Sequence, residues 1–418
     1  MASATANQTF VVVGASMAGA SAVEELRRAG FTGRLVLVGA EPHLPYERPP
    51  LSKGVLTGAT PDTRVFLRDA AFYAAQQVDL LLGTAAVGLD TARREVLLAS
   101  GARLRFDRLL IATGGQARRL AVPGADLPGV LELRTLDDAR ALRDALHDVA
   151  ARGGRVVIAG AGFIGAEVAA ACRQLGVAVT VLEVLPAMLG RVLGAEVGAF
   201  CAQIHRAHGV DLRLGEAIMA VRGSARVTAV ATAAGAELAC DLLLVGVGML
   251  PADEWLRDTG VALEDGVLVD EYCATNVPGI FAAGDVARWP YQLTGERVRL
   301  EHEDNALRQG AAAARNMLGE RLPYTPVPYF WSDVYDLKMQ YVGHATTWDQ
   351  VVLRGQPPVA PFIACYLRQG RLLAALAVNQ VREVATLKRL IAARVTPDPA
   401  ALADAAVPLK SLLPDRGP

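Results

Sequence analysis

The sequence VVVGASMAG at residues 11–19 and the sequence VVIAGAGFIG at residues 156–165 decide the fold of this chain. Each begins with β-branched apolar residues, which favour a strand, and each leads into an alanine-rich amphipathic stretch, which favours a helix. A glycine-rich turn between a strand and a helix is typical of a dinucleotide site. Two such turns in one chain predict two nucleotides held close together, which is the arrangement that electron transfer between cofactors needs.

The three glycines of such a turn have separate roles. The first permits the tight bend, the second lets the backbone approach the pyrophosphate, and the third lets the helix pack closely on the strand. The pyrophosphate then lies at the helix N-terminus, where free N–H groups and the helix dipole favour an anion. The second turn is complete, whereas the first has Ser16 in the middle position, and serine is small enough to leave the approach open. The glycines are Gly14 and Gly19 in the first turn and Gly160, Gly162 and Gly165 in the second.

A carboxylate follows the next expected strand after each turn. Residues 34–38 (RLVLV) end near Glu41, and residues 178–182 (AVTVL) end at Glu183. A carboxylate in this position accepts hydrogen bonds from ribose hydroxyls and repels a 2′-phosphate, so Glu183 predicts NADH rather than NADPH. A solvated acid at a strand end is the alternative interpretation, and it is less credible for two acids in register.

Two further segments predict strands that end in small-residue turns, and the second of them, residues 279–285, fits a chain that returns beneath a bound cofactor. Residues 109–114 (LLIATG) and residues 279–285 (GIFAAGD) are apolar and end in small residues. A helix is expected over residues 304–318. A single glycine-rich turn is a weak signal, but two turns, each with its acid, together with these segments predict a chain that binds a flavin and a nicotinamide nucleotide.

Length and composition limit the class of protein. A chain of 418 residues exceeds a single core and predicts two or three domains. Hydrophobic residues make up 52% and charged residues 20%, as in globular proteins, and the net charge of −1 gives no whole-molecule reason to expect nucleic acid. No segment reaches the roughly 18–20 apolar residues that span a bilayer, and no export signal is recognisable, so we expect a cytoplasmic protein without a membrane partner.

The cysteines and histidines are scattered. No pair of cysteines forms C-x-x-C or C-x4-C, so we expect free thiols in a reducing compartment and no bound metal. The histidines show no triad or metal spacing, and we interpret them as surface or packing residues. The cysteines are Cys172, Cys201, Cys240, Cys273 and Cys365.

The composition and hydrophobic pattern of the sequence change after residue 328. Aromatic residues cluster at 329–335, and short alternating segments such as 351–354 and 362–367 predict strands. A separate α+β domain is therefore expected from residue 329 onward. The last residues, 414–418, are expected to form a loose tail.

Five further segments carry a resemblance to a known family: RPPLSK at 48–53, LRTLDDA at 133–139, AAGD at 282–285, NA at 305–306 and FWSD at 330–333. With the two glycine-rich turns, they make essentially the whole chain resemble the flavoprotein ferredoxin reductases of the glutathione-reductase fold group. These enzymes serve [2Fe–2S]-type ferredoxins that feed cytochromes P450 or aromatic-ring dioxygenases. The chain departs from the family pattern at Ala252, where asparagine is common, and in the acidic run at 302–304.

The resemblance implies an α/β fold of three layers with two Rossmann-like dinucleotide-binding domains and a C-terminal α+β domain. The implied FAD-binding domain is discontinuous and comprises residues 7–116 and 250–328. The implied NADH-binding domain comprises residues 117–249, and the implied interface domain comprises residues 329–418.

The resemblance also implies which residues contact the cofactors. Arg134 would offer its guanidinium to a phosphate, Asp285 would accept a hydrogen bond from a ribityl hydroxyl, and Ala86 would contribute backbone at the adenine end. The cofactor-binding residues that we predict are Gly14, Ala15, Ser16, Ala18, Gly19, Glu41, Arg48, Lys53, Ala86, Ala112, Thr113, Gly114, Arg134, Gly160, Gly162, Phe163, Ile164, Gly165, Glu183, Gly248, Gly284, Asp285, Glu303 and Trp331.

Three residues are predicted to be catalytic: Lys53, Glu167 and Trp331. In the family, Lys53 and Glu167 would meet near flavin N5, where the lysine offsets charge on the reduced flavin and the glutamate orients the lysine. The alternative for this pair is an interdomain salt bridge without redox effect. Trp331 would lie beside the isoalloxazine, and its alternative is an ordinary core tryptophan.

These observations together predict an NADH-dependent ferredoxin reductase that contains FAD. Neither the first helix nor the loop after the second strand contains a redox cysteine, so electrons are expected to leave the flavin for a one-electron acceptor without a thiol relay. The expected partner is an acidic iron–sulfur ferredoxin, steered by local arginines, and indirectly a P450 or dioxygenase. An NADH oxidase, a rubredoxin reductase and a non-enzymatic NADH-sensing flavoprotein like the apoptosis-inducing factors remain alternatives.

Overall fold

The computed structural model describes residues 7–357 and 359–414 of the chain. These residues fold into two compact units. Along the chain, the first unit is made of the residues up to Glu47 together with Asp62–Gln116 and Leu250–Pro328, and the second is made of Arg48–Pro61, Ala117–Met249 and the residues from Tyr329 onward. Most of the expected tail, residues 415–418, lies outside the described residues.

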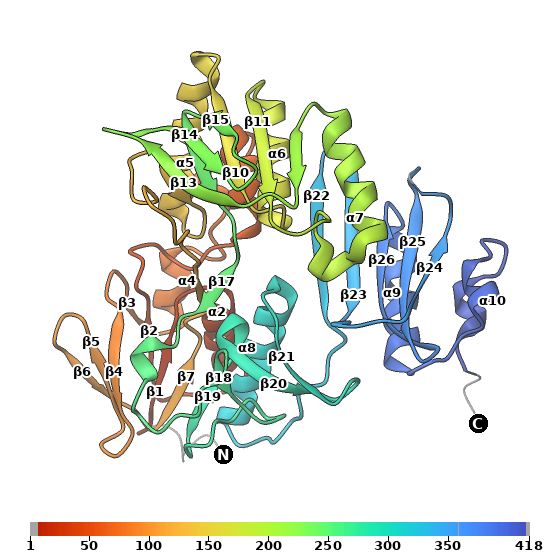
Figure 1. Ribbon diagram of the computed structural model, residues 1–418. Helices are drawn as coiled ribbons and strands as arrows, with labels where there is room; N and C mark the ends of the chain where they lie inside the picture. Colours follow the sequence, from red (N-terminus) through yellow and green to blue (C-terminus); the bar gives the residue numbers. More distant parts are fainter. Residues whose placement is uncertain (1–6, 358, 415–418) are drawn as a thin grey trace. The chain divides into compact units, whose positions relative to one another are not determined.

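A parallel five-stranded sheet forms the centre of the first unit, with the order β19-β7-β1-β2-β3 (Figure 1). Its inner strands are runs of valine, leucine and isoleucine and are almost completely buried, as expected for a parallel sheet covered on both faces. The strands are β1 (Thr9–Val13), β2 (Arg34–Val38), β3 (Val78–Leu81), β7 (Arg108–Ile111) and β19 (Ile280–Ala282).

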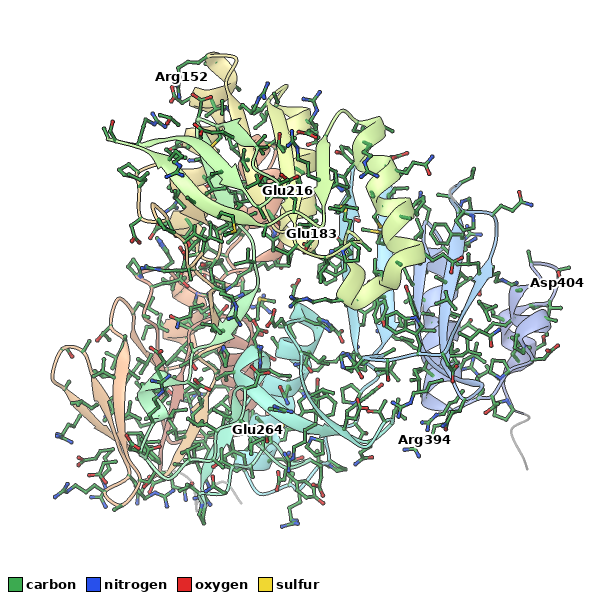
Figure 2. The ribbon with its side chains drawn as sticks, in the orientation of Figure 1. Arg152, Glu183, Glu216, Glu264, Arg394 and Asp404 are labelled. Atoms are coloured by element: carbon green, nitrogen blue, oxygen red, sulfur yellow. The ribbon has the colours of Figure 1, made fainter. Side chains whose placement is uncertain are left out.

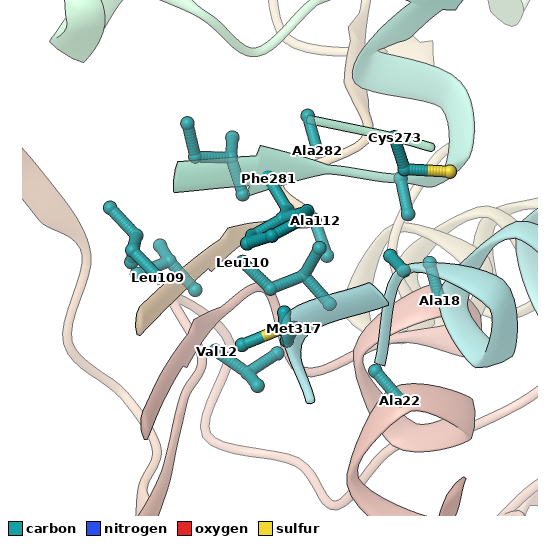
Figure 3. Packing of buried hydrophobic residues seen from close by; sticks show 14 of the residues in the cluster. Val12, Ala18, Ala22, Leu109, Leu110, Ala112, Cys273, Phe281, Ala282 and Met317 are labelled. Carbon is teal, nitrogen blue, oxygen red and sulfur yellow. The ribbon is translucent and has the colours of Figure 1, made fainter. Parts of the chain in front are cut away.

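Helices α2 (Met17–Arg28) and α8 (Glu303–Met317) lie side by side in the first unit. They can approach closely because small residues face each other: a Cβ atom on Gly310 would lie 2.3 Å from the carbonyl oxygen of Ala18. Figure 3 shows Ala18 of α2 and Met317 of α8 in one apolar core with the sheet. Because α2 begins directly after β1, its N-terminus lies at the carboxyl edge of the sheet, where α/β proteins bind nucleotides.

Smaller elements complete the first unit, among them two three-stranded sheets with the orders β4-β5-β6 and β18-β20-β21. These elements are η2 (Asp62–Arg64), α4 (Ala70–Ala75), β4 (Ala86–Asp90), β5 (Glu95–Leu98), β6 (Arg103–Arg105), η3 (Glu254–Leu256), β18 (Val267–Leu268), η4 (Gly284–Val286), β20 (Ala287–Tyr291) and β21 (Glu296–Arg299). The short strands β8 (Gly115–Ala117) and β17 (Met249–Pro251) stand where the chain passes between the units.

The second unit contains another parallel five-stranded sheet, with the order β12-β11-β10-β16-β9. An antiparallel sheet of three short strands, β13, β14 and β15, accompanies it. The strands are β9 (Val130–Glu132), β10 (Arg155–Ala159), β11 (Ala178–Glu183), β12 (Asp211–Leu214), β13 (Ile218–Gly223), β14 (Val227–Thr232), β15 (Glu237–Ala239) and β16 (Leu242–Val245).

The three longest helices of the second unit differ in how they begin or in how regular they are. Helix α5 (Leu136–Ala151) starts at a capping box formed by Thr135 and Asp138. Helix α6 (Phe163–Gln174) starts at the glycine-rich turn and has neither a side-chain cap nor an acidic residue in its first turn. Helix α7 (Gly190–Ala207) is interrupted at a glycine, residue 194, whose φ is +76°. The uncapped start of α6 leaves its first N–H groups available to an anion.

An antiparallel five-stranded sheet with the order β22-β23-β26-β25-β24 forms the C-terminal part of the second unit. Helix α9 packs on β23 and β26, and β22 packs on α6 (Figure 1). The elements are β22 (Tyr329–Val334), β23 (Leu337–Gly343), β24 (Gln350–Arg354), β25 (Phe362–Arg368), β26 (Arg371–Val378), η5 (Val381–Glu383), α9 (Val384–Ala392), α10 (Pro399–Ala403) and η6 (Leu409–Leu412).

The segment at residues 48–61 packs with the second unit, although the sequence resemblance includes it in the FAD-binding stretch 7–116. Its helices η1 (Pro49–Ser52) and α3 (Gly54–Thr57) contact α5 and α6. The physical reason is the burial of apolar surface, because the side chain of Leu56 is fully buried in the same core as residues of α5 and α6. The assignment of cofactors to these parts of the chain stays a prediction.

The fold class predicted from the sequence is confirmed: two Rossmann-type α/β regions are joined to a C-terminal α+β region. The expected strand at 34–38 has those bounds in the structure, and the expected helix at 304–318 is shifted by one residue. Among the described residues, none of the helices combines the length and the apolar character needed to cross a membrane.

Candidate functional site

The second glycine-rich turn has the geometry that its sequence predicts. A Cβ atom on Gly160, whose φ is +99°, would lie 2.3 Å from the carbonyl oxygen of residue 246, and one on Gly165 would lie 2.1 Å from the carbonyl oxygen of Gly160. A Cβ atom on Gly162 would meet nothing within 4 Å. The outer two glycines are therefore required by the protein itself, and the middle one leaves open space in front of the N-terminus of α6.

The first turn repeats this arrangement in the first unit. Gly14 has a φ of +122°, and its Cβ atom would lie 2.0 Å from the carbonyl oxygen of Ala112; a Cβ atom on Gly19 would lie 1.9 Å from the carbonyl oxygen of Gly14. Ser16 is the N-cap of α2, yet its hydroxyl makes no capping hydrogen bond to the helix. The first turn of α2 also contains no acidic residue. The free N–H groups at its N-terminus can therefore receive an anion.

Both predicted ribose-binding acids lie near the end of the strand that comes after the glycine-rich turn of their own unit: Glu183 ends β11, and Glu41 lies three residues after the end of β2. Glu183 is the last residue of β11, and its two carboxylate oxygens accept hydrogen bonds from the backbone N–H groups of Ala161 (2.7 Å) and Leu185 (2.9 Å). A second acid, Glu216, donates its backbone N–H to the carbonyl oxygen of Glu183 at 2.9 Å, and Figure 2 shows both side chains in this region. Glu41 accepts a hydrogen bond of 2.5 Å from the hydroxyl of Tyr46.

The predicted Lys53–Glu167 pair is formed within the second unit. The Nζ atom of Lys53 lies 2.8 Å from Oε2 of Glu167 and donates to the carbonyl oxygen of Pro49 at 3.2 Å. The side chain of Glu167 is 4% exposed and that of Lys53 is 24% exposed. A buried carboxylate with a partly exposed ammonium is an arrangement in which the acid fixes the position of a cation that can still reach a neighbouring ligand.

Two serines that the sequence analysis missed complete the environment of Glu167. The hydroxyl of Ser52 donates to Oε2 of Glu167, and the hydroxyl of Ser332 donates to Oε1 at 2.6 Å. Both serines are buried, Ser332 completely. Their neighbours Lys53 and Trp331 were predicted to be catalytic, so sequence adjacency to those residues was the only available signal.

Trp331 lies in β22 directly opposite Gln340 of β23. The ring of Tyr329 stacks beside the indole with the two centroids 6.1 Å apart, and its hydroxyl accepts a hydrogen bond of 2.7 Å from Nε2 of Gln340. The Nζ atom of Lys388 lies 4.1 Å from the centroid of the Tyr329 ring, which is a cation–π contact. Trp331 is only partly buried, so it is a strand residue supported on one side and not a fully enclosed core tryptophan.

The second unit also contains other predicted residues, among them Arg48, Phe163, Ile164 and Gly248. Arg48 donates to the carbonyl oxygen of Arg134 at 2.5 Å, so the structure brings these two together. The ring of Phe163 packs edge-on against Phe330, with the centroids 4.9 Å apart. Ile164, in the first turn of α6, is 41% exposed. Gly248 has a φ of +111°.

The predicted residues of the first unit lie at strand and helix ends. Thr113 donates to the carbonyl oxygen of residue 252 at 2.7 Å, within the small-residue turn after β7. The backbone N–H of Gly284 donates to Oε1 of Gln309 at 2.9 Å; Gln309 is fully buried on α8, and the sequence analysis missed it. The remaining predicted residues of the first unit are Ala15, Ala18, Gly114, Ala86 at the start of β4, Asp285 in η4 and Glu303 at the start of α8.

Cysteine chemistry finds no support within the described part of the chain. All five cysteines are free and buried, and burial raises the pKa of four of them, Cys172, Cys201, Cys240 and Cys365, to about 12. Burial likewise raises the pKa of the fifth thiol, Cys273. Such thiols are poor nucleophiles at neutral pH. Among the same residues, no group of three or more His, Cys, Asp or Glu side chains could hold a metal ion.

Comparison with known proteins places this arrangement in a family. The family model described as pyridine nucleotide-disulphide oxidoreductase matches residues 8–310, and the model described as reductase C-terminal matches residues 329–413. The ferredoxin–NAD(+) reductase component of the biphenyl dioxygenase system of Paraburkholderia xenovorans is 40% identical over 406 residues, which cover 97% of this chain and 98% of that protein. Putidaredoxin reductase of Pseudomonas putida is 35% identical over 98% of this chain and 97% of its own length.

A solved structure agrees with these matches. The crystal structure of a covalent putidaredoxin reductase–putidaredoxin complex superposes with a TM-score of 0.93 at 36% identity, covering 97% of this chain and 98% of the other. The resemblance predicted from the sequence is therefore confirmed. This chain belongs to the pyridine nucleotide-disulphide oxidoreductase family, among its ferredoxin reductases that carry a reductase C-terminal domain.

Proposed function

We propose that this chain is an FAD-containing, NADH-dependent ferredoxin reductase that supplies single electrons to an iron–sulfur ferredoxin. The observation that carries this proposal is the pair of glycine-rich turns, each with open helix N–H groups and with a carboxylate at the end of the adjacent strand or within three residues after it. A single nucleotide would need only one such turn. Relatives named as ferredoxin reductases of dioxygenase and putidaredoxin systems support the same function.

The residues present fit the two cofactors. The open space at Gly162 and the small Ser16 leave room for the pyrophosphates of NADH and FAD, and the outer glycines bring strand and helix close enough to present their N–H groups. Glu183 and Glu41 would hold the adenosine riboses of NADH and FAD, respectively. Asp285 and Glu303, at the starts of η4 and α8, would hold the flavin from the first unit.

When bound, FAD takes a hydride from NADH and passes electrons onward one at a time, which amino-acid side chains cannot do. The chain's contribution is orientation and charge. Glu167 holds the ammonium of Lys53 in one position, and that cation would stabilise negative charge on the cofactor. The family resemblance implies that Trp331 would lie beside the isoalloxazine of the flavin.

The electron acceptor is proposed to be a separate protein because the cysteines cannot form a relay. All five thiols are buried and mutually unpaired, despite the word disulphide in the name of the family. An acidic [2Fe–2S] ferredoxin, serving in turn a P450 or a ring-hydroxylating oxygenase, fits this requirement. The buried free thiols also agree with a reducing compartment, and we propose a cytoplasmic location.

Anaerobic mixing of the purified protein with NADH, followed by ferredoxin, tests the proposal. We expect a yellow protein whose colour is bleached by NADH and restored by a [2Fe–2S] ferredoxin much faster than by oxygen or rubredoxin. Catalase-sensitive NADH consumption that is as fast without any carrier would identify an NADH oxidase instead. A persistent flavin–NAD charge-transfer band with negligible turnover would identify an NADH-sensing flavoprotein.

A further inference from the structure

Strand β22 is attached to helix α6 at two points. Phe330 packs against Phe163, and Ser332 donates to Glu167, while Trp331 between them points to the opposite face of the strand. The spacings match, because alternate strand residues share one face and residues four apart lie on one face of a helix. The helix that begins at the second glycine-rich turn therefore fixes the position of the strand that carries Trp331.

The two carboxylate oxygens of Glu167 interact with different segments of the chain. Oε1 accepts from Ser332, whereas Oε2 accepts from Ser52 and pairs with Lys53. The terminal torsion of a glutamate has only a broad preference, so the orientation of the carboxylate depends on its hydrogen bonds. The hydroxyl of Ser332, which is fully buried, donates to Oε1 and thereby keeps Oε2 turned toward Lys53.

We propose that Ser332 is a positioning residue that acts through Glu167 to hold the ammonium of Lys53 in place. Neither the family resemblance nor the predicted site assigns a role to this serine. The hydroxyl acts through the carboxylate on Lys53, whereas the strand of Trp331 is also held by the separate contact of Phe330 with Phe163. The catalytic consequence of this inference rests on the proposed function, whereas its structural part does not.

The chain offers an unusually direct test, since it contains only four lysines: Lys53, Lys338, Lys388 and Lys410. The holoprotein is treated with a limiting amount of acetic anhydride, and acetylation of each lysine is measured by peptide mass spectrometry, with Lys410 as internal standard. In Ser332→Ala, we expect the acetylation rate of Lys53 to rise roughly three- to tenfold, because a hydrogen bond to a charged group is lost. The rates of Lys338 and Lys388 should stay as in the wild type.

Two variants control this measurement. Ser411→Ala removes an exposed hydroxyl that donates to the carbonyl oxygen of Pro408 in the same unit, and it should leave Lys53 unchanged. Ser332→Thr keeps a hydroxyl and should retain the wild-type rate. If Ser332→Ala gives no folded protein, Ser332→Cys replaces it, because a thiol is a much weaker donor. An unchanged rate at Lys53 in the folded variant overturns the proposal.

Rapid kinetics with NADH separate positioning from a general structural role. In Ser332→Ala, the limiting rate of flavin reduction should fall about tenfold while the dissociation constant of NADH changes little. In a Lys53→Met background, Ser332→Ala should have no further effect on that rate, and an equal additional loss would overturn the proposal. If NADH reduces no flavin in any variant but Lys53 labelling still rises, the positioning role stands and the proposed function fails.

Discussion

The Nζ atom of Lys53 lies 2.8 Å from a carboxylate oxygen of Glu167, and the glutamate is the more deeply buried partner of the pair. A buried charge that loses its partner is left uncompensated, so such pairs persist where a role requires them. Here the hydroxyls of Ser52 and Ser332 also donate to the carboxylate and would support it in the absence of the lysine. The ion pair can therefore be tested by removing the cation without removing the whole network.

Lys53→Met should slow the reduction of the flavin by NADH about 10- to 100-fold while changing the dissociation constant of NADH much less. The reason is that the ammonium stabilises charge on the reduced cofactor and does not bind the nucleotide. Stopped-flow absorbance measures both quantities, and Lys338→Met serves as the matched control. The catalytic role is wrong if the variant only loses bound flavin and the flavin that remains is reduced at the wild-type rate.

Glu183→Arg should raise the ratio of kcat/KM for NADPH to that for NADH about 10- to 100-fold, because it replaces a carboxylate that repels a 2′-phosphate with a guanidinium that binds one. Glu183 also accepts hydrogen bonds from the backbone N–H groups of Ala161 and Leu185. Part of any loss of activity will therefore come from loosening of the glycine-rich turn that contains Ala161. Glu183→Gln keeps an acceptor and removes the charge, which makes it the control. An unchanged ratio in Glu183→Arg would refute the ribose assignment.

The two glycines at the start of α6 should respond differently to alanine. Gly162→Ala adds a methyl group in open space at a negative φ, so the melting temperature should stay near that of the wild type while KM for NADH rises about tenfold. Gly165→Ala forces a methyl group to 2.1 Å from a backbone oxygen and should destabilise the protein by ~1–3 kcal/mol. Calorimetry and steady-state kinetics distinguish them. Equal effects on KM without loss of stability would contradict this interpretation.

His205 should make the second unit sensitive to acid. Burial lowers the pKa of His205 from 6.5 to about 4, with His208 adding a smaller effect, and the hydroxyl of Tyr335 lies 3.3 Å from its Nδ1 atom. Because the unfolded chain binds the proton more tightly, the free energy of unfolding falls as the pH decreases from about 6.5 to about 4, by ~2 kcal/mol already at pH 5.

His205→Gln, which keeps a polar group beside Tyr335, should remove this component. Urea unfolding of wild type and variant at pH 7.5 and pH 5 measures it, with each loss of free energy compared between the two proteins. The variant should lose ~2 kcal/mol less on acidification than the wild type. The same loss in both proteins would show that His205 is protonated in the folded state at pH 5.

The parts of the fold set by local sequence could be predicted, and those set by distant contacts could not. The strands and turns around Gly14 and Gly160 follow from residues within a few positions, because the positive φ values and the apolar runs are local requirements. The small sheet β4-β5-β6 was not predicted, since its strands are short and carry mixed polar and apolar residues. The segment 48–61 packs with the second unit through Leu56, which no local pattern specifies.

The same distinction applies to the site. Lys53 and Glu167 were paired through the family resemblance, and the structure forms that pair. Ser52 and Ser332 were missed because a buried serine has no sequence signature, and its role depends on which carboxylate the fold brings to it. Gln309, whose side chain accepts from the backbone of Gly284, was missed for the same reason.

The central claim is that this chain seats one FAD and one NADH with no redox-active thiol pair between them. An anaerobic titration of the purified holoprotein with NADH, followed by its visible absorbance, tests this claim most directly. Complete bleaching is expected at one NADH per flavin, with the same endpoint after the protein has been treated with a thiol-alkylating reagent. A requirement for two NADH per flavin, or a protein that stays colourless after incubation with FAD, would contradict it.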